Sequence, residues 1–236
     1  MTMMQSAKAT GSTWTPLYKT ASVSAAAYVV LVLVPVMLIF LAPVPPASGG
    51  PLLEYIAAHK AVYLTELVCF VGLAVPALVV FTAVAIALTN VDKSRALLGG
   101  LLGVVSEGIA LALGSSPPSL HGGLVVLSDS YAAAETAGER ARLESAADAL
   151  IAATNAVSWA GILTAAAILL LSLLMREQTF GRSLAVFGVV TGALGIISEA
   201  LRPLIGPAYL VYGLLLPTWF ALVGSGLRPR RTPSSG

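Results

Sequence analysis

The sequence predicts an all-α fold, a polytopic six-helix transmembrane bundle with an internal parallel helical-hairpin repeat. Three observations lead to this prediction: the composition, six long apolar runs and a pair of similar segments. Of the 236 residues, 57% are apolar and 10% are charged, whereas soluble proteins are about 45–50% apolar and about 25% charged. This composition excludes a water-soluble globule. It also excludes a disordered chain, which needs low hydrophobicity and high charge.

The six apolar runs are long enough to cross the roughly 30 Å hydrocarbon core of a bilayer, which takes about 20 residues of helix. They are continuous and lack the alternation of membrane β-strands, so we predict helices. The predicted spans cover residues 21–43, 61–89, 96–114, 149–175, 183–201 and 203–227. Glu66 falls in the outer turns of the second span, and Glu107 and Glu199 fall within the third and the fifth. The first run is too long for the apolar region of a signal peptide, so we expect it to be retained.

The basic residues predict the orientation. Nine of the thirteen Lys and Arg residues lie in the N-terminal segment, in alternate connections and in the C-terminal tail. By the positive-inside rule, residues 1–20 form a cytoplasmic N-terminal segment and residues 228–236 a cytoplasmic tail, so both termini lie inside. No basic residue lies deep in a span, and this excludes the Schiff-base lysine of a rhodopsin.

Two longer connections fall on the opposite, outer side. Residues 44–60 begin with a Pro- and Gly-rich stretch and continue with a pattern typical of a short helix. Residues 131–148 are rich in Ala, Glu and Arg, which are good helix formers, so we expect an outer helical segment that leads into the fourth span. Thr136 and Glu139 have the spacing of a helix capping box. The alternative for this segment is a solvated spacer.

Two segments of the chain resemble each other. Residues 97–107 read LLGGLLGVVSE and residues 189–199 read VVTGALGIISE, so both contain the pattern Gly-x-x-Gly-x-x-Ser-Glu. We interpret this likeness as a duplicated helical hairpin, in which spans two and three correspond to spans four and five in the same orientation. Such a parallel repeat differs from the inverted repeats of many transporters.

The glycines predict which way the two repeated acids point. Gly99, Gly103 and Glu107 are spaced four residues apart, and so are Gly195 and Glu199. Residues at this spacing share one face of a helix, and small residues mark the faces on which membrane helices approach each other closely. We therefore expect both acids to face the interior of the bundle.

Polar residues of the spans gather towards the outer half of the membrane. The candidate ligand-binding residues are Glu107, Glu199, Glu66, Asn155, Ser158, Trp159 and Arg202. An ionisable group inside a bilayer costs several kcal/mol and is by default a hypothesis of function. In the alternative interpretation, the acids cap or bridge neighbouring helices and Arg202 neutralises Glu199.

The sequence lacks the motifs of common chemistry. It contains no phosphate-binding loop, no Gly-x-Ser-x-Gly elbow, no His-Glu-x-x-His helix and only one cysteine, Cys69. His59 and His121 are single histidines in connections, a pattern more typical of solvated side chains than of a metal site. We therefore expect no enzymatic activity, no catalytic residue, no cofactor, no metal and no nucleic-acid partner.

Aromatic side chains stand out in the last span. Tyr209, Tyr212 and Trp219 are expected to be anchors at the membrane interface, with the lining of a ligand cavity as the alternative.

Several segments carry a resemblance to a known family. They are LLEYIAAHKAVYL (52–64), VDKSRALLGGLLG (91–103), the Ala/Glu/Arg segment before the fourth span, and LLLPTWFALVGSGLRPR (214–230). With these features the chain resembles an uncharacterised six-span bacterial integral membrane protein family, a domain of unknown function. The resemblance implies a bacterial plasma (inner) membrane location, and it transfers no activity and no site residue.

Two functions follow as expectations. In the first, the protein binds or transports a small ligand, lipid or ion through an outward-facing acidic cavity that contains Glu107. In the second, it is a non-catalytic accessory or structural subunit of a membrane protein complex, and its glycine faces and outer helix dock onto a membrane protein partner. The second predicts that the acids are paired within a closed bundle. Both place the chain in a lipid bilayer.

Overall fold

The computed structural model describes residues 13–38, 40–113, 121–176 and 180–227, and within these ranges it contains helices and no strand. Six helical segments are long and apolar enough to cross a membrane. The all-α, six-helix prediction is therefore confirmed. Residues 1–12 of the predicted cytoplasmic N-terminal segment, and the predicted tail 228–236, lie outside the described residues.

The helical elements depart from the predicted spans mainly at their ends. The helices are α2 (Thr15–Leu38), α3 (Gly49–Ala58), α4 (Lys60–Gly72), α5 (Ala74–Leu88), α6 (Lys93–Leu113), α7 (Gly122–Ala133), α8 (Ala137–Val157), α9 (Gly161–Met175), α10 (Arg182–Ala200), α11 (Arg202–Ile205) and α12 (Tyr209–Gly226), with 3-10 turns η1 (Ser158–Ala160) and η2 (Gly206–Ala208). Helices α4 and α5 form one span, Lys60–Leu88, and α8, η1 and α9 form one long segment, Ala137–Met175. The last long helix begins later than predicted because the chain turns at Gly206, whose φ is +50°, a conformation that glycine adopts readily.

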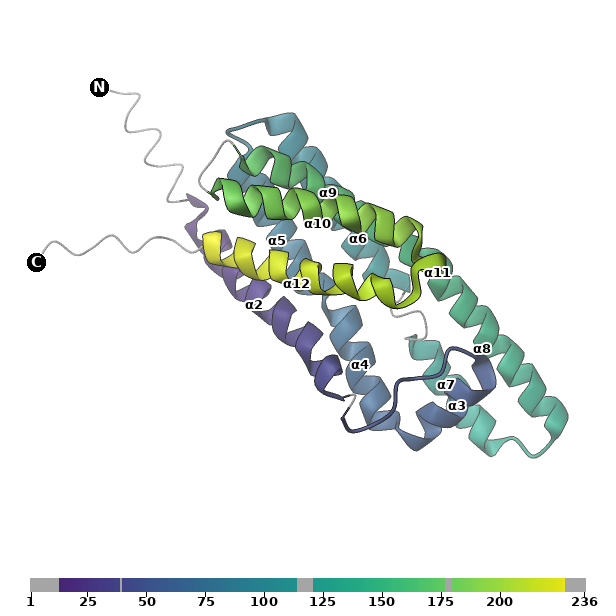
Figure 1. Cartoon of the computed structure of the whole chain (residues 1–236). Coiled ribbons are helices and arrows are strands. Elements are labelled where there is room, and N and C mark those ends of the chain that lie inside the picture. The colour runs from purple at the N-terminus through teal and green to yellow at the C-terminus, as the bar shows by residue number, and fades with distance from the viewer. Residues whose placement is uncertain (1–12, 39, 114–120, 177–179, 228–236) are drawn as a thin grey trace, which may run out of the picture.

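The long helices form a bundle in which the hairpins α5–α6 and α9–α10 are joined through contacts between α6 and α9. Helix α12 contacts both α2 and α10 and closes the opposite side. Figure 1 shows α2 beginning and α12 ending at one end of the bundle, here called the inner end. Helices α3 and α7 lie at the other, outer end, because one crossing precedes α3 and three precede α7.

Helices α3, α7 and the first half of α8 form an outer layer with its own apolar core. Leu52, Leu53 and Leu124 are fully buried in this core, and the hydroxyl of Ser128 donates a 2.8 Å hydrogen bond to the carbonyl of Leu53. The predicted outer segment 131–148 is mostly helical; most of its side chains are exposed, but Ala147 is fully buried in this core. The first outer helix, α7, starts earlier than residue 131. His121 is its N-cap, and Nδ1 of His121 accepts a 3.0 Å hydrogen bond from the backbone amide of Gly123.

The second outer helix begins with the predicted capping box. The amide of Glu139 donates to Oγ1 of Thr136 at 3.2 Å, and the amide of Thr136 donates to Oε2 of Glu139 at 3.1 Å. These bonds stabilise the charged carboxylate and lower the pKa of Glu139. The break between the two outer helices therefore falls just before Ala137, one residue ahead of Gly138.

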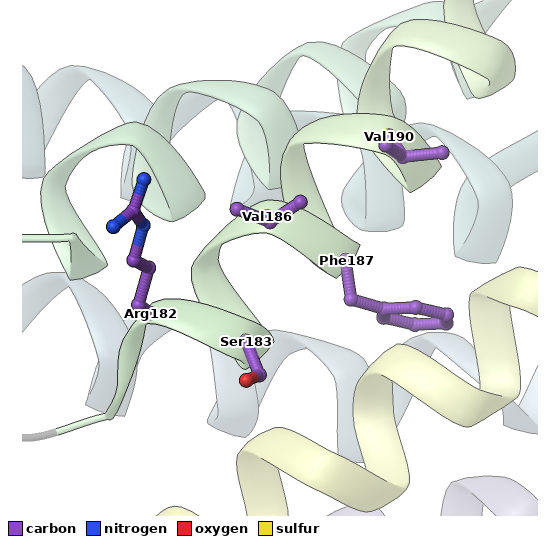
Figure 2. A pocket seen from close by; sticks show the side chains of 5 residues that line it. All are labelled: Arg182, Ser183, Val186, Phe187 and Val190. Carbon is purple, nitrogen blue, oxygen red and sulfur yellow. The ribbon is translucent and has the colours of Figure 1, made fainter.

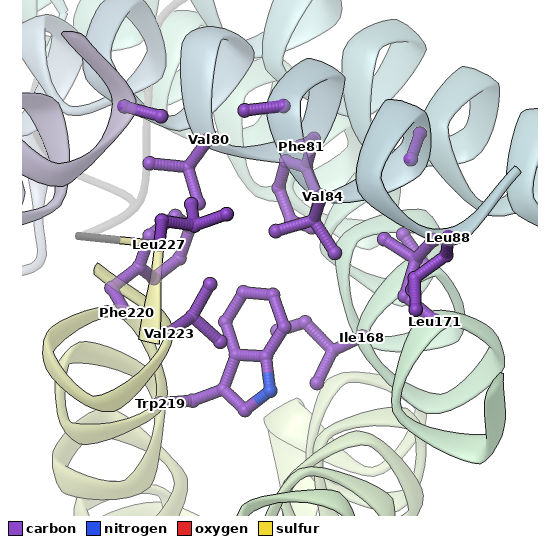
Figure 3. Close-up of a cluster of buried hydrophobic side chains, with 14 of the residues drawn as sticks. Val80, Phe81, Val84, Leu88, Ile168, Leu171, Trp219, Phe220, Val223 and Leu227 are labelled. Atoms are coloured by element: carbon purple, nitrogen blue, oxygen red, sulfur yellow. The ribbon is translucent and has the colours of Figure 1, made fainter. Parts of the chain in front are cut away.

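Three aromatic side chains pack together in the apolar core of the bundle (Figure 3). The ring of Phe81 on α5 stacks with Trp219 of α12 at a centroid distance of 5.9 Å and meets Phe220 edge-on. Trp219 is fully buried, and its Nε1 donates a 3.2 Å hydrogen bond to Oγ of Ser172 on α9. The expectation that Trp219 anchors at the membrane interface is wrong, because its polar edge finds a partner inside the bundle and needs no interfacial water.

Glycines of α6 and α10 face this core. A Cβ at Gly103 would collide with the ring of Phe81, and one at Gly192 would lie 2.5 Å from the backbone nitrogen of Leu169 on α9. Both positions therefore allow close helix approach, as the glycine spacing predicts. Each repeated segment sits in the second helix of a hairpin, but the equivalence of the two hairpins stays a prediction.

The orientation can be tested by cysteine labelling in a Cys69→Ala background. Ser145 on α8 is exposed at the outer end, and Ser94 at the start of α6 is exposed at the inner end. A membrane-impermeant maleimide added to intact cells should label Ser145→Cys and should label Ser94→Cys only after the membrane is permeabilised. The reverse pattern would overturn the predicted orientation and move every polar group below to the cytoplasmic half.

The close approach of α9 and α10 makes a stability prediction. Gly192→Ala forces the backbones apart and should cost about 1–3 kcal/mol, the usual range for overpacking. Gly108→Ala is the control, because a Cβ there meets nothing within 4 Å; it should be neutral or stabilising by up to about 1 kcal/mol. Thermal unfolding of the purified proteins in detergent measures both, and equal melting temperatures would contradict the tight α9–α10 contact.

Candidate functional site

The buried polar side chains of the bundle gather at the outer end of its apolar core. On α6, α9 and α10, the core residues Ala96, Ile168 and Ala185 lie towards the inner end. The buried acids Glu107 and Glu199 lie at the outer ends of α6 and α10. Both acids face the bundle interior as predicted, with exposed fractions of 9% and 4%.

Glu107 ends a short chain of hydroxyl groups. Its Oε1 lies 3.1 Å from Oγ1 of Thr164 on α9. That hydroxyl lies 2.7 Å from Oγ of Ser106. Ser106 in turn donates a 2.7 Å hydrogen bond to the backbone carbonyl of Ala160 in η1. The chain therefore links α6 to the start of α9 through three short oxygen–oxygen contacts.

The number of hydrogens available to these three contacts indicates whether the carboxyl group of Glu107 is protonated. A hydroxyl carries one hydrogen, so Ser106 and Thr164 supply two hydrogens for three contacts, and the carbonyl of Ala160 only accepts. With an ionised Glu107, Thr164 must donate to the carboxylate, and Ser106 must share its single hydrogen between two acceptors. With a neutral Glu107, each contact has its own hydrogen. The geometry therefore favours a carboxyl group that carries a proton.

Glu199 has a different environment. The hydroxyl of Tyr209 donates a 2.7 Å hydrogen bond to its Oε1, and Nη1 of Arg202 lies 3.5 Å from its Oε2. The guanidinium of Arg202 also lies over the ring of Tyr209, 4.6 Å from its centroid. Gly161 makes room for the carboxyl group, because a Cβ there would lie 2.7 Å from Cδ of Glu199. The expectation that Arg202 neutralises Glu199 is confirmed.

Two buried tyrosines complete the cluster. Tyr212 on α12 interacts electrostatically with both Glu107 and Glu199, and Tyr28 on α2 interacts with Glu107. Both side chains are at least 95% buried, so Tyr212 is no interfacial anchor. Sequence reasoning missed Tyr28 and Thr164 because no motif or spacing distinguishes them from ordinary residues of an apolar span.

Other predicted site residues differ in their burial and neighbours. Glu66 is buried on α4, and its electrostatic neighbours within the described chain include Tyr55 and Tyr63. Asn155 and Trp159 are exposed, Trp159 to 57%. Trp159 lies in the 3-10 turn η1 and Asn155 lies in α8, and their role in ligand binding stays a prediction.

The side chain of Ser158, another predicted site residue, lies outside the described part of the structure. No group of three His, Cys, Asp or Glu side chains that could hold a metal ion occurs among the described residues.

Two surface hollows lie elsewhere on the molecule. One, of about 570 Å³, is lined by the first turns of α10 (Figure 2). The other, of about 590 Å³, lies on the α7–α8 hairpin and is lined by residues that include Glu135, Glu139 and Arg142. Neither hollow is lined by Glu107 or Glu199. Both acids are buried, and each forms side-chain contacts with residues of neighbouring elements.

Comparisons with protein-family models, curated proteins and solved structures find no match for the chain. The resemblance to a six-span bacterial family, and the bacterial plasma membrane that it implies, stay predictions. Any function must therefore be inferred from the geometry of the cluster itself.

The pairing of Glu199 with Arg202 makes a prediction that a double-mutant cycle can test. Arg202→Gln leaves a carboxylate that is 4% exposed without its cation, which should lower the free energy of unfolding by about 1–3 kcal/mol. Adding Glu199→Gln should recover most of that loss, because a neutral amide needs no cation and still accepts from Tyr209. Thermal or denaturant unfolding in detergent measures the coupling.

The control for this cycle is Arg95→Gln. Arg95 pairs with Asp92 at 3.3 Å with the same sequence spacing, but these side chains are 68% and 35% exposed. This substitution should change stability by less than about 0.5 kcal/mol. Additive effects of Arg202→Gln and Glu199→Gln would show that the two side chains do not form an energetic pair.

Proposed function

We propose that this integral membrane protein binds a small ligand or ion at the acidic cluster in the outer half of its bundle, and that Glu107 is the binding carboxyl group. The simplest bound species is a proton. The observation that carries the proposal is the environment of Glu107, which is 9% exposed and contacts the neutral hydroxyl group of Thr164, itself in contact with Ser106. Within the described residues, no cation forms a salt bridge with it.

The energetic reason is the cost of an uncompensated charge. An ionised carboxylate in a hydrocarbon environment costs several kcal/mol, and hydroxyl donors repay only part of that cost. A proton or a small cation bound to Glu107 removes the penalty. Glu199 meets the same requirement with Arg202 and Tyr209, so it needs no further partner. The two acids therefore have different roles, a binding group and a structural one.

The surroundings support exchange of the bound species on the outer side. Glu107 lies at the end of α6 nearer the outer layer, and the phenols of Tyr28 and Tyr212 and the carboxyl group of Glu199 are its electrostatic neighbours. These groups form a polar patch next to the apolar core. Such patches mark ion and proton paths in many membrane proteins.

The second candidate is a non-catalytic accessory or structural subunit. One observation favours it: both acids form hydrogen bonds within packed helices, and the described surface hollows lie elsewhere. In this function the acids only tie helices together. A membrane protein partner would then contact the exposed helix faces.

A charge-neutralising variant distinguishes the two functions. In the first, the fold holds a neutral Glu107 that ionises on unfolding, so unfolding releases a proton. Stability should then fall as the pH rises above about 5, by up to about 1.4 kcal/mol per pH unit. Glu107→Gln keeps the shape without titrating, and it should flatten this slope. Melting temperatures in detergent between pH 5 and pH 8 measure the effect.

The matched control is Glu54→Gln, which removes an exposed carboxyl group on α3 and should keep the slope of the wild type. Identical pH profiles for the wild type and Glu107→Gln would reject a binding role for Glu107 and favour the accessory subunit. If Glu107→Gln fails to fold, Thr164→Val tests the same hydrogen-bonded group, because it removes the hydroxyl that contacts the carboxyl group. A changed pH slope in that variant supports the proposal, and an unchanged slope rejects it.

A further inference from the structure

The hollow at the inner end of α10 has a polar end and an apolar wall. Its lining residues are Arg182, Ser183, Val186, Phe187 and Val190. Figure 2 shows Arg182 and Ser183 on the first turn of α10, Val186 and Val190 further along the helix, and Phe187 pointing towards α12. This order places a cation and a hydroxyl at the membrane boundary and an apolar surface beside them.

Among the residues that the structure describes, the polar end of this hollow has no anionic partner. Arg182 is exposed and forms no salt bridge with any described residue. It also stands in the first turn of α10, where the helix dipole disfavours a cation and favours an anion. The N-cap residue Gly181 provides no side-chain cap for this helix end. A bound anion would satisfy the guanidinium and the first-turn amides together.

The apolar end excludes a small soluble anion as the natural occupant. Val186 and Val190 are each 45% exposed on the membrane-spanning part of α10, so an acyl chain would cover them in a bilayer. Only a molecule with an anionic head and an apolar chain contacts both ends. Basic pockets at the cytoplasmic ends of membrane helices bind such lipids in other proteins.

We propose that the inner end of α10 is a binding site for an anionic phospholipid. The phosphate contacts Arg182 and the hydroxyl of Ser183, and an acyl chain lies along Val186 and Val190 beside Phe187. This site is independent of the acidic cluster, which lies at the opposite end of α10. Any lipid can bind weakly here through its acyl chain, because the helix face is apolar. An anionic headgroup binds more tightly, because it also contacts Arg182.

The test uses the purified full-length protein in detergent with phosphatidylglycerol, phosphatidylcholine or inorganic phosphate. Native mass spectrometry measures bound lipid, and the melting temperature gives a second readout. Phosphatidylglycerol should bind about fivefold more tightly than phosphatidylcholine, the preference that one arginine near an anionic surface provides. Millimolar inorganic phosphate should displace little of the lipid, because it cannot cover the apolar wall.

Two substitutions locate the site. Arg182→Gln should remove the preference for phosphatidylglycerol, whereas Arg182→Lys, which keeps the charge, should retain most of it. The control Arg142→Gln removes an exposed arginine at the outer hollow and should leave lipid binding unchanged. Equal binding of the two lipids to the wild type, an unchanged preference in Arg182→Gln, or full displacement by inorganic phosphate would each overturn the proposal.

Discussion

The close approach of helices at glycine positions is the constraint on which the other contacts depend. Gly192 brings α10 against the backbone of α9, and Gly188 lies against Trp219 at the point where its indole donates to Ser172. Gly161 leaves the space that the carboxyl group of Glu199 fills. In a bilayer, apolar area gives little drive for helix association, because lipid tails are as apolar as the side chains. Shape and buried hydrogen bonds therefore hold this bundle together, and both require short interhelical distances.

The two intramembrane acids show two ways to meet one electrostatic requirement. Glu199 contacts a cation at the start of α11 and a phenol at the start of α12, so its charge is compensated by residues close in sequence. Glu107 contacts one hydroxyl group on another helix, that of Thr164 on α9, which in turn contacts Ser106. A pair that compensates itself can stay ionised and stay in place. In the proposed function, Glu107 instead binds a proton or an ion, because its hydroxyl partner carries no charge.

The features predicted well from the sequence are those determined by the apolar environment of the bilayer or by residue spacing within a single helix. Continuous apolar runs must be helices in lipid, and glycines spaced four residues before Glu107 share its face, so the fold class and the direction of the acid followed. The burial of Trp219 did not follow, because it depends on a serine and a glycine from two other helices. The exposure of Trp159 did not follow either, because depth along a span does not say which way a side chain points. The site was predicted in part, since hydroxyl partners such as Thr164 leave no pattern in sequence.

The chain of hydroxyl groups ends at a carbonyl that can only accept a hydrogen bond. This couples the charge of Glu107 to the packing of α6 against α9. Its last member, the carbonyl of Ala160, only accepts, so the hydrogen of Ser106 is committed to it. The hydrogen of Thr164 is then left for either Ser106 or the carboxyl group. When Glu107 loses its proton, Thr164 turns to the carboxylate and the Ser106–Thr164 contact loses its hydrogen. Protonation of one acid thus strengthens a helix–helix contact, and ionisation weakens it.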